Sequence, residues 1–314
     1  MKKRILVIGS SNMDFVCNTE RLPVAGETIT TAQNYMLVPG GKGGNTAVAA
    51  SRLGADCVFC AKLGNDAYGK NLYDFYKSEG IDTRHIYKST EHPTGLAAIM
   101  VEGNGDNRII VYPGANRQMT SEEVEASVIT YPGAVVMQLE IDYERVVEAV
   151  KHSNERKIPV VLDAGPADKN LDLSRLGELE IFSPNETETE ILTGIKPSAY
   201  ESCIAAAIEI RRLVKTKFVV LKLGDKGCFI YDGLYANFVP AYKINAVDTT
   251  AAGDSFTAAL TLEYLRNGKN IIEAAKYANA VGAMVASKAG AAPSIPTHEE
   301  VLEFISQRKD EINA

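Results

Sequence analysis

The segment Asp248-Thr249-Thr250-Ala251-Ala252-Gly253-Asp254-Ser255-Phe256 leads directly into a run of alanine and leucine that extends to Leu265. This pattern predicts that an extended segment turns into a helix over residues 253–265, with Ala251, Ala252 and Gly253 in its first turn. A helix start has unpaired N–H groups and the positive end of the helix dipole, and small side chains let an oxyanion approach them closely. The segment therefore predicts a phosphate-binding helix start.

Asp254 stands beside this predicted anion seat. Its carboxylate would repel a bound phosphate, so a functional Asp254 must do something other than bind the phosphate. It could act as a general base that takes the proton of a hydroxyl attacking the phosphorus. The alternative is the general preference for an acidic side chain in the first turn of a helix. The residue pattern by itself leaves both interpretations open.

Length and composition describe an ordinary globular chain. Its 314 residues are 46% hydrophobic and 23% charged, enough apolar material for a large core in one large α/β domain or in two domains. The net charge of −7 and the lack of a basic cluster argue against nucleic acid and membrane surfaces as partners.

The first apolar run, Ile5 to Ile8, is too short for a signal peptide and predicts a buried strand. Because no apolar run is long enough to span a membrane, and the five cysteines come without a secretion signal, we expect a cytoplasmic protein.

Cys57 and Cys60 form a lone C-x-x-C pair inside the apolar run Cys57 to Lys62. Residues three apart in a strand point to opposite faces, so this pair cannot jointly bind a metal or close a disulfide. We therefore expect two separate core thiols. The chain has four isolated histidines without metal-ligand spacing, and no role is assigned to them: His85, His92, His152 and His298.

Apolar strands alternate with amphipathic helices through most of the chain, which predicts an α/β fold with a mostly parallel sheet. The expected strands are Ile5 to Ile8, Cys57 to Lys62, Ala134 to Gln138, Pro159 to Asp163, Ile181-Phe182 and Phe218 to Leu223. The expected helices are Asn45 to Leu53, Ala67 to Ser78, Tyr143 to Asn154, Gly253 to Leu265, Ile271 to Ser287 and Thr297 to Gln307.

Two inserts interrupt this alternation with strand-like sequence and no helix of their own. The first covers residues 15–38, and the second is a predicted hairpin of Gly95 to Val101 and Asn107 to Tyr112 about a Gly-rich turn. We expect the two inserts to form a small separate sheet.

Polar side chains follow the predicted strands where a doubly wound sheet binds ligands, outside the carboxyl ends of the strands. They are Asn12, Asp14, Glu140, Asp163, Asn185 and Glu188. Each residue alone could cap a helix or begin a turn. Their convergence on one sheet edge favours a binding site.

The segment Gly40-Gly41-Lys42-Gly43-Gly44-Asn45 is neither a Walker A loop nor a dinucleotide fingerprint. A Walker A loop has Lys followed by Ser or Thr, and the dinucleotide motif comes directly after the first strand. Glycine packing without function remains one interpretation. The other is a polyhydroxylated ligand, which suits exposed backbone N–H groups next to the Asn45 carboxamide.

Two of these segments resemble the signatures of the ribokinase-like (PfkB) carbohydrate kinases. Residues 248–256 resemble the family's D-T-x-A-A-G-D segment, residues 40–45 resemble its sugar-binding glycine motif, and the similarity extends over nearly the whole chain. The resemblance implies a single kinase domain over residues 1–314, folded as a three-layer α/β/α sandwich. It also implies a small β-sheet lid, formed by residues 15–38 and 95–112, through which two copies form a homodimer.

The implied activity is ATP-dependent phosphorylation of the 5-hydroxyl of D-ribose with Mg²⁺. Asp254 would be the base, and Ala251, Ala252 and Gly253 would bind the transferred phosphoryl group. The resemblance assigns the sugar to Asn12, Asp14, Gly40, Gly41, Lys42, Asn45, Glu140 and Asp254. It assigns ATP and magnesium to Asn185, Glu188, Lys222, Gly224, Asp225, Gly227, Gly253 and Asn279. A monovalent cation site for K⁺ would comprise Asp248, Thr250, Val285, Lys288, Gly290 and Ser294.

Two residues depart from the commonest form in ribokinases: Lys222 stands where Thr is usual, and Gly44 stands where Ala is usual. A lysine at position 222 could reach a phosphate. Asn185 and Glu188 could also be a simple acidic helix start, and Asn279 an ordinary helix-surface residue.

Other functions remain open. A related kinase could act on deoxyribose, fructose, a ketogluconate or a nucleoside, and a non-catalytic sugar or nucleotide sensor could share the fold. The intact Asp254 beside an intact small-residue helix start argues against a sensor.

Overall fold

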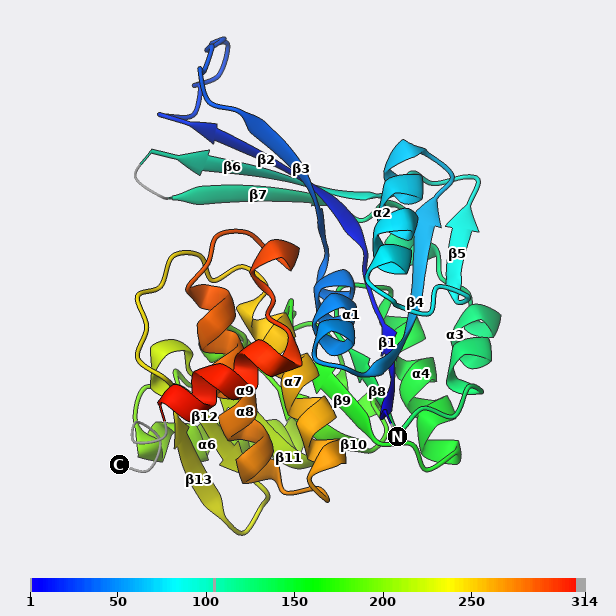
Figure 1. The fold of residues 1–314 in the computed structure, drawn as a ribbon. Helices are drawn as coiled ribbons and strands as arrows, with labels where there is room; N and C mark the ends of the chain where they lie inside the picture. Colours follow the sequence, from blue (N-terminus) through cyan, green and yellow to red (C-terminus); the bar gives the residue numbers. More distant parts are fainter. Residues whose placement is uncertain (1, 104–105, 309–314) are drawn as a thin grey trace.

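The computed structural model describes residues 2–103 and 106–308, and its centre is a nine-stranded sheet (Figure 1). The strand order is β13-β12-β11-β10-β9-β8-β1-β4-β5. Neighbouring strands are parallel from β11 to β5, and β12 and β13 add an antiparallel edge. The strands are β1 (Arg4–Ile8), β4 (Asp56–Gly64), β5 (Ile86–Ser89), β8 (Ala134–Met137), β9 (Val160–Asp163), β10 (Leu179–Ser183), β11 (Thr216–Lys222), β12 (Gly227–Tyr231) and β13 (Ala236–Pro240). The predicted mostly parallel sheet is confirmed.

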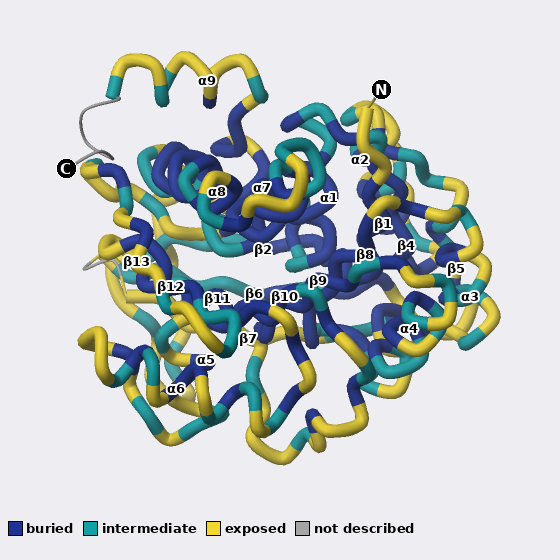
Figure 2. The backbone as a smooth tube through the Cα atoms, turned by 90° about the horizontal axis from the view of Figure 1, so that it is seen from below, coloured by how far each residue is buried: buried dark blue, intermediate teal, exposed yellow. Residues whose placement is uncertain are grey.

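Helices cover both faces of this sheet, so the central strands are buried on both sides (Figure 2). Ile5 and Val7 of β1 point into one hydrophobic core, and Leu6 and Ile8 point into the other. The first core is covered by α1 (Lys42–Arg52), α2 (Ala67–Ser78), α7 (Ala252–Arg266), α8 (Ile271–Ala286) and α9 (His298–Gln307). The second is covered by α3 (Ser121–Val128), α4 (Tyr143–Glu155), α5 (Glu186–Thr193) and α6 (Tyr200–Leu213). Burial of each such aliphatic side chain contributes roughly 1.5–3 kcal/mol, which explains the continuous apolar runs in these strands.

The two cysteines of the C-x-x-C pair lie on opposite faces of β4. Cys57 belongs to the first core and Cys60 to the second. Burial raises the pKa of both thiols, that of Cys60 to about 12. They are separate core thiols, as the alternation of side chains along a strand predicts. All five cysteines of the chain are free.

A second sheet projects from the main body, with strand order β3-β2-β6-β7 (Figure 1). It consists of β2 (Asn12–Thr19), β3 (Tyr35–Gly40), β6 (Gly95–Glu102) and β7 (Asn107–Tyr112). The two predicted inserts therefore do form a separate sheet, joined by the parallel pair of β2 and β6. Part of the Gly-rich turn between β6 and β7 lies outside the described residues.

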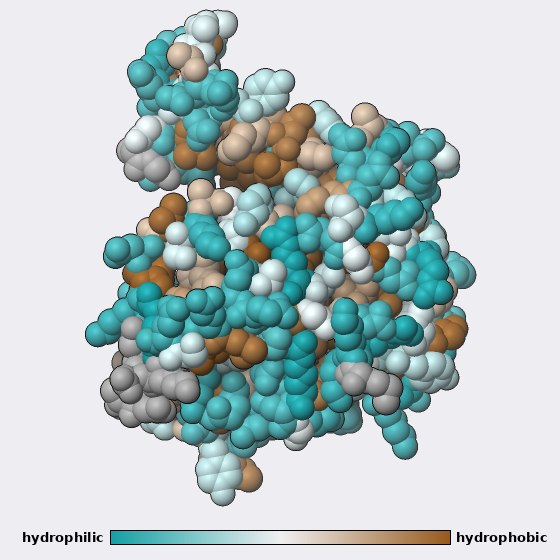
Figure 3. Space-filling model, in the orientation of Figure 1, coloured by the Kyte–Doolittle hydropathy of each residue, from teal (hydrophilic) through white to brown (hydrophobic). Residues whose placement is uncertain are grey.

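Apolar side chains gather on this projecting sheet (Figure 3). Its large exposed hydrophobic residues are Tyr35, Met36, Leu37, Ile109, Ile110, Val111 and Tyr112. Because consecutive residues of a strand point to opposite sides, these exposed residues lie on both faces of the sheet, where the chain's own helices leave them uncovered. Across the described part of the chain, no helix combines the length and the apolar character needed to cross a membrane.

Candidate active site

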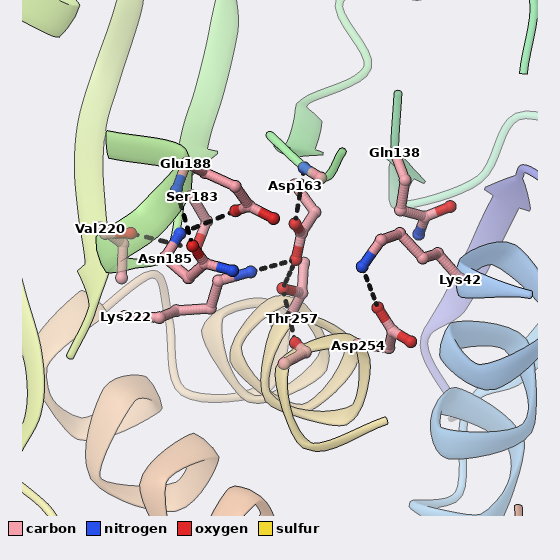
Figure 4. A network of polar contacts seen from close by, with 12 residues as sticks. Lys42, Gln138, Asp163, Ser183, Asn185, Glu188, Val220, Lys222, Asp254 and Thr257 are labelled. Carbon is pink, nitrogen blue, oxygen red and sulfur yellow. Dashed lines mark hydrogen bonds and ion pairs between the residues drawn. The ribbon is translucent and has the colours of Figure 1, made fainter. Parts of the chain in front are cut away.

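The N-terminus of α7 meets the N-terminal half of α1 at the carboxyl edge of the main sheet (Figure 4). Ala251 is the N-cap residue of α7, in the left-handed conformation with φ 62°, and the helix begins at Ala252. For a residue with a Cβ this conformation costs roughly 1–2 kcal/mol, and such strain gathers at functional sites. No side chain caps this helix start. The Ala252 N–H donates a 3.2 Å hydrogen bond to the Thr249 carbonyl, and no described residue accepts a hydrogen bond from the N–H of Ala251 or Gly253, as an anion-binding turn requires.

Asp254 is 6% exposed and is held from α1, not by N–H groups of its own helix. Asn45 Nδ2 donates a hydrogen bond of 2.9 Å to one carboxylate oxygen, and Lys42 Nζ lies 3.8 Å from the other. Burial raises the pKa of Asp254, and the Lys42 ammonium only partly offsets this. A carboxylate that merely served the helix dipole would not need partners from another helix, so this geometry favours the role of proton acceptor.

The glycine segment packs the start of α1 against the loop that follows β1. Gly41 has φ 83°, and a Cβ on it would lie 2.9 Å from the backbone nitrogen of Asn12. A Cβ on Gly43 would lie 2.6 Å from the carbonyl carbon of Gly9. This close approach lets Glu140 accept a 3.0 Å hydrogen bond from the backbone N–H of Lys42. The structure therefore shows the glycine packing, and a ligand at this segment stays a prediction.

At Gly44, one of the two departures from the resembled pattern, an added Cβ would collide with the Tyr76 hydroxyl. That hydroxyl makes a 2.7 Å hydrogen bond with Ser11 Oγ. The missing methyl is therefore matched by a buried tyrosine.

Asn12 and Asp14 are the first and third residues of β2 and so face the same side of the strand. Asp14 is 8% exposed, and its Oδ1 has no hydrogen-bond partner among the described residues. Burial, followed by the nearby charges of Glu140 and Asp254, raises the pKa of Asp14 to about 7. Buried acceptors are rarely left unpaired unless they serve a ligand or water, so Asp14 is a candidate ligand contact at this edge.

On the other side of Asp254 lies a charged network around Asp163, the last residue of β9 (Figure 4). Lys222, at the end of β11, forms a short ion pair with Asp163 Oδ2, and Thr257 Oγ1 donates a 2.7 Å hydrogen bond to the same oxygen. Burial alone would raise the pKa of Asp163, but Lys222 and Lys42 hold it below its ordinary value. The Lys222 ammonium also lies 3.6 Å from the position of a Cβ on Gly253, so positive charge stands next to the uncapped helix start.

Asn185 and Glu188 form a capping box at the start of α5. Each side chain accepts a 2.8 Å hydrogen bond from the backbone N–H of the other. The acidic helix start is thus real, yet Glu188 is only 7% exposed, and its free oxygen lies 2.6 Å from where a Cβ on Gly165 would stand. Burial raises the pKa of Glu188, and Asp163 and Lys222 are among its charged neighbours. Glu188 therefore belongs to the charged network as well as to the cap.

The remaining residues assigned to the nucleotide lie along β11 to β13. Gly224 and Asp225 form the turn after β11, and Gly227 begins β12 with φ 104°. Asn279 of α8 is buried, and its Nδ2 donates to the carbonyls of Val239 and Pro240 at 3.0 and 2.9 Å. It is not a surface residue, because its amide joins α8 to β13.

Asp248 ties the entry to α7 to the loop after α8. Its carboxylate accepts hydrogen bonds of 2.9 Å from the N–H of Thr250 and 2.9 Å from the N–H of Gly290. Burial would raise the pKa of Asp248, but a 2.6 Å hydrogen bond from Thr250 Oγ1 and these two backbone bonds lower it overall. Val285 is buried in α8, Lys288 follows that helix, and Ser294 Oγ donates to the Ala291 carbonyl at 2.7 Å. The residues assigned to a cation site thus lie on two segments that are hydrogen-bonded together.

Sequence reasoning missed three polar residues of this edge: Ser10, Asn116 and Thr257. Ser10 Oγ bonds to Glu140, Thr257 supports Asp163, and Asn116 holds both Ser11 and Asn12. The hydrogen-bond partners of these three residues are distant in sequence, so no local sequence pattern predicts their roles. Within the described ranges, no group of three or more His, Cys, Asp and Glu side chains could hold a metal ion by itself.

Comparison with known proteins gives consistent matches over nearly the full length. Residues 2–298 match the model of the pfkB family of carbohydrate kinases. The chain is 37% identical over 308 residues to the ribokinase of Haemophilus influenzae, covering 97% of this chain and 99% of that protein. It is 34% identical over 306 residues to the deoxyribokinase of Salmonella typhi, covering 96% and 98%. The structure of Arabidopsis thaliana ribokinase complexed with ribose and ATP matches with a TM-score of 0.85 and 31% identity, covering 97% and 99%.

Proposed function

The chain belongs to the pfkB family of carbohydrate kinases, and from this premise we propose that it transfers the γ-phosphoryl group of ATP to the 5-hydroxyl of D-ribose. The observation that carries the proposal is the position of Asp254. Its buried carboxylate is hydrogen-bonded to Asn45 of α1, a residue assigned to the sugar, and belongs to the first turn of α7, whose start no side chain caps. The choice of D-ribose rests on the ribokinases to which the chain is similar over nearly its whole length.

In this mechanism, Asp254 accepts the proton of the primary hydroxyl as that oxygen attacks the γ-phosphorus in line. Its raised pKa suits this task, because a general base works best when its pKa approaches the operating pH. The N–H groups of Ala251, Ala252 and Gly253 stabilise charge on the transferred phosphoryl oxygens. Such fixed electrostatic stabilisation is the main contribution of a protein to phosphoryl transfer.

Lys222 supplies positive charge on the nucleotide side. Its ammonium stands beside Gly253 and is held there by Asp163, which is 1% exposed. A lysine at this position can contact a phosphate of ATP, a role that the usual threonine could fill only with a neutral hydroxyl.

Magnesium fits the acidic residues of the same edge. Mg²⁺ typically binds one or two carboxylates together with substrate phosphates, and Glu188 offers the carboxylate oxygen that its capping box does not use. The ion would neutralise developing phosphate charge when bound. The residues near Asp248 and Gly290 offer hard oxygen donors for a potassium ion, which would fix the entry to α7.

The sugar site comprises Asn12, Asp14, Gly40, Gly41, Lys42, Asn45 and Glu140. The unpaired Oδ1 of Asp14 supports this assignment, because a sugar hydroxyl would supply the missing donor. Deoxyribose is the second candidate substrate, favoured by the 34% identity to a deoxyribokinase.

We further propose that the projecting sheet is a lid and that two copies dimerise through its exposed apolar residues. The exposed apolar residues of β3 and β7 support this, because a small sheet that leaves such side chains uncovered is marginal in water. Free cysteines and an ATP-dependent reaction support a cytoplasmic location.

The test is an ADP-release assay with ATP and Mg²⁺ against D-ribose, 2-deoxyribose, fructose, a ketogluconate and a nucleoside. D-ribose should give the highest kcat/KM, with ribose 5-phosphate as the product. Preference for 2-deoxyribose would select the second candidate, and sugar-independent ADP release alone would refute a sugar kinase.

A further inference from the structure

Asn116 is a buried polar residue without an assigned role in the reaction. It lies in the short 3-10 turn Gly114–Gln118 after β7 and is 1% exposed. Its side chain accepts a 2.8 Å hydrogen bond from the backbone N–H of Ser11, and its Nδ2 donates a 2.7 Å hydrogen bond to Asn12 Oδ1. It therefore bridges the loop after β1 and the first residue of β2, at the ligand side of the sheet edge.

The backbone N–H of Ser11 determines the orientation of both amides. An N–H can only donate, so the oxygen of Asn116 must face Ser11 and its nitrogen must face Asn12. A nitrogen that donates requires an acceptor, so Asn12 must turn its own oxygen toward Asn116. The Asn12 Nδ2 group is then left facing the other way, and no residue in the described ranges accepts a hydrogen bond from it.

From this chain of contacts we infer that Asn116 is a positioning residue that makes Asn12 a hydrogen-bond donor to the sugar. The inference rests on the proposed function, because it takes a sugar as the ligand of Asn12. It assigns Asn116 no contact with the sugar itself.

The orientation matters because the same edge already presents acceptors. Asp14 shares a strand face with Asn12, and its unpaired Oδ1 accepts the single proton of a hydroxyl. A hydroxyl that gives its proton to a carboxylate has only lone pairs left for its other neighbour. An Asn12 side chain that presents its N–H group can donate to this hydroxyl oxygen, whereas one that presents its carbonyl oxygen would repel the hydroxyl oxygen.

Close packing surrounds the hydrogen bond between Asn116 and Asn12. A Cβ on Gly95 would collide with both Asn116 Nδ2 and Asn12 Oδ1, so glycine is required beside this hydrogen bond. The Ser11 side chain is fixed in turn by Tyr76, whose hydroxyl lies 2.7 Å from Ser11 Oγ. The donor direction of Asn12 is therefore set by residues distant in sequence.

Asn116→Asp tests the inference, because it keeps the shape and the acceptor for Ser11 but replaces the donor by an acceptor. Asn12 can then donate to the new carboxylate oxygen at position 116 only by turning its Nδ2 toward it, which leaves the Asn12 oxygen facing the sugar. We expect the KM for D-ribose to rise about 10- to 100-fold, the effect of losing one hydrogen bond and opposing two acceptors. The KM for ATP should stay within about twofold, and kcat should change less than the sugar KM, as for an interaction made equally in ground and transition states.

Asn154→Asp is the matched control. Asn154, on α4 in the opposite layer of helices, also accepts from one backbone N–H and donates to one carbonyl, both of Glu178. It should leave the sugar KM unchanged. If Asn116→Asp does not fold, as judged by circular dichroism, Asn116→Ala removes the constraint without adding charge and should raise the sugar KM about 3- to 10-fold.

A double-mutant cycle with Asn12→Ala decides whether Asn116 acts through Asn12. The inference predicts that Asn116→Asp causes no further rise in sugar KM once the Asn12 carboxamide is gone. Independent, multiplicative effects would overturn it, as would a native sugar KM in a folded Asn116 variant. A native chain that phosphorylates no sugar would instead refute the proposed function, and this inference with it.

Discussion

Replacing Asp14 by Asn should make the protein more stable and less active at neutral pH. Burial raises the pKa of Asp14 from its ordinary value of 3.8 to about 7. The folded state thus binds the proton more tightly than the unfolded state, so the contribution of Asp14 to stability is complete below pH 3.8 and is lost as the pH rises through 7. Asparagine cannot ionise and avoids this loss.

The size of the effect follows from the shift. At about 1.4 kcal/mol per pKa unit, Asp14→Asn should raise the free energy of unfolding by about 3–4 kcal/mol at pH 7.5 and by less than about 1 kcal/mol at pH 4. The same change removes an acceptor for a sugar hydroxyl, so the KM for D-ribose should rise about 10- to 100-fold.

Urea unfolding at the two pH values measures the stability change, and ADP release measures the sugar KM. Asp74→Asn is the control, because the exposed Asp74 pairs with Lys70 on the surface of α2 and has no burial to relieve. It should give no gain at either pH. A gain for Asp14→Asn that is absent, or equal at both pH values, would contradict the argument from burial.

Three further predictions concern pH, potassium and assembly. Turnover should fall on acidification at a higher pH than for an ordinary aspartate, because Asp254 must be unprotonated to act and its pKa is raised; an unchanged pH–rate profile in Asp254→Glu would argue for another base. Potassium should raise turnover several-fold over sodium or lithium at equal ionic strength, and Asp248→Ala should abolish this difference. Equal rates in potassium and in a bulky organic cation would mean either that the site is absent or that the Lys288 ammonium occupies it. The double variant Asp248→Ala, Lys288→Ala separates these two outcomes. Light scattering at micromolar concentration should give a dimer, and Ile110→Asp at an exposed position of β7 should give a monomer; a monomeric native chain would contradict the lid interface.

Periodicity and local capping predict most of the main layers. The bounds of α2 are predicted as observed, because Asp66 caps the helix by accepting from Gly69 and the apolar face is regular. The projecting sheet is predicted from the absence of helical pattern in its two inserts. The start of α7 is predicted within one residue, but Ala251 is its left-handed N-cap and does not lie in the first turn as predicted.

Other elements are missing from the prediction although their patterns are present. The antiparallel pair β12 and β13 turns at Asp232-Gly233, where Gly233 has φ 100° and Asp232 accepts from two backbone N–H groups. Helix α3 begins with a capping box of Thr120 and Glu123. Both are short elements, for which hydrophobic periodicity is weak evidence.

The supporting residues of the site cannot be read from sequence for a different reason. Asn116 lies 105 residues from Ser11 and 104 from Asn12, its hydrogen-bond partners. Asp163 and Lys222 are separated by 59 residues, and only the parallel pairing of β9, β10 and β11 brings them together. Contacts of this kind depend on tertiary packing, which a local pattern does not contain.

The central claim is that Asp254 accepts the proton of the attacking hydroxyl, and Asp254→Asn tests it most directly. The variant keeps the shape of the side chain that Asn45 and Lys42 hold, so D-ribose should still bind. Calorimetry should therefore give a D-ribose Kd within about tenfold of the native value, the range expected for one altered hydrogen bond, while kcat for ADP release falls about 10²- to 10⁴-fold. An Asp254→Asn protein that binds D-ribose and retains more than about half of the native kcat would contradict the account, since a positioned general base contributes at least about 10²-fold.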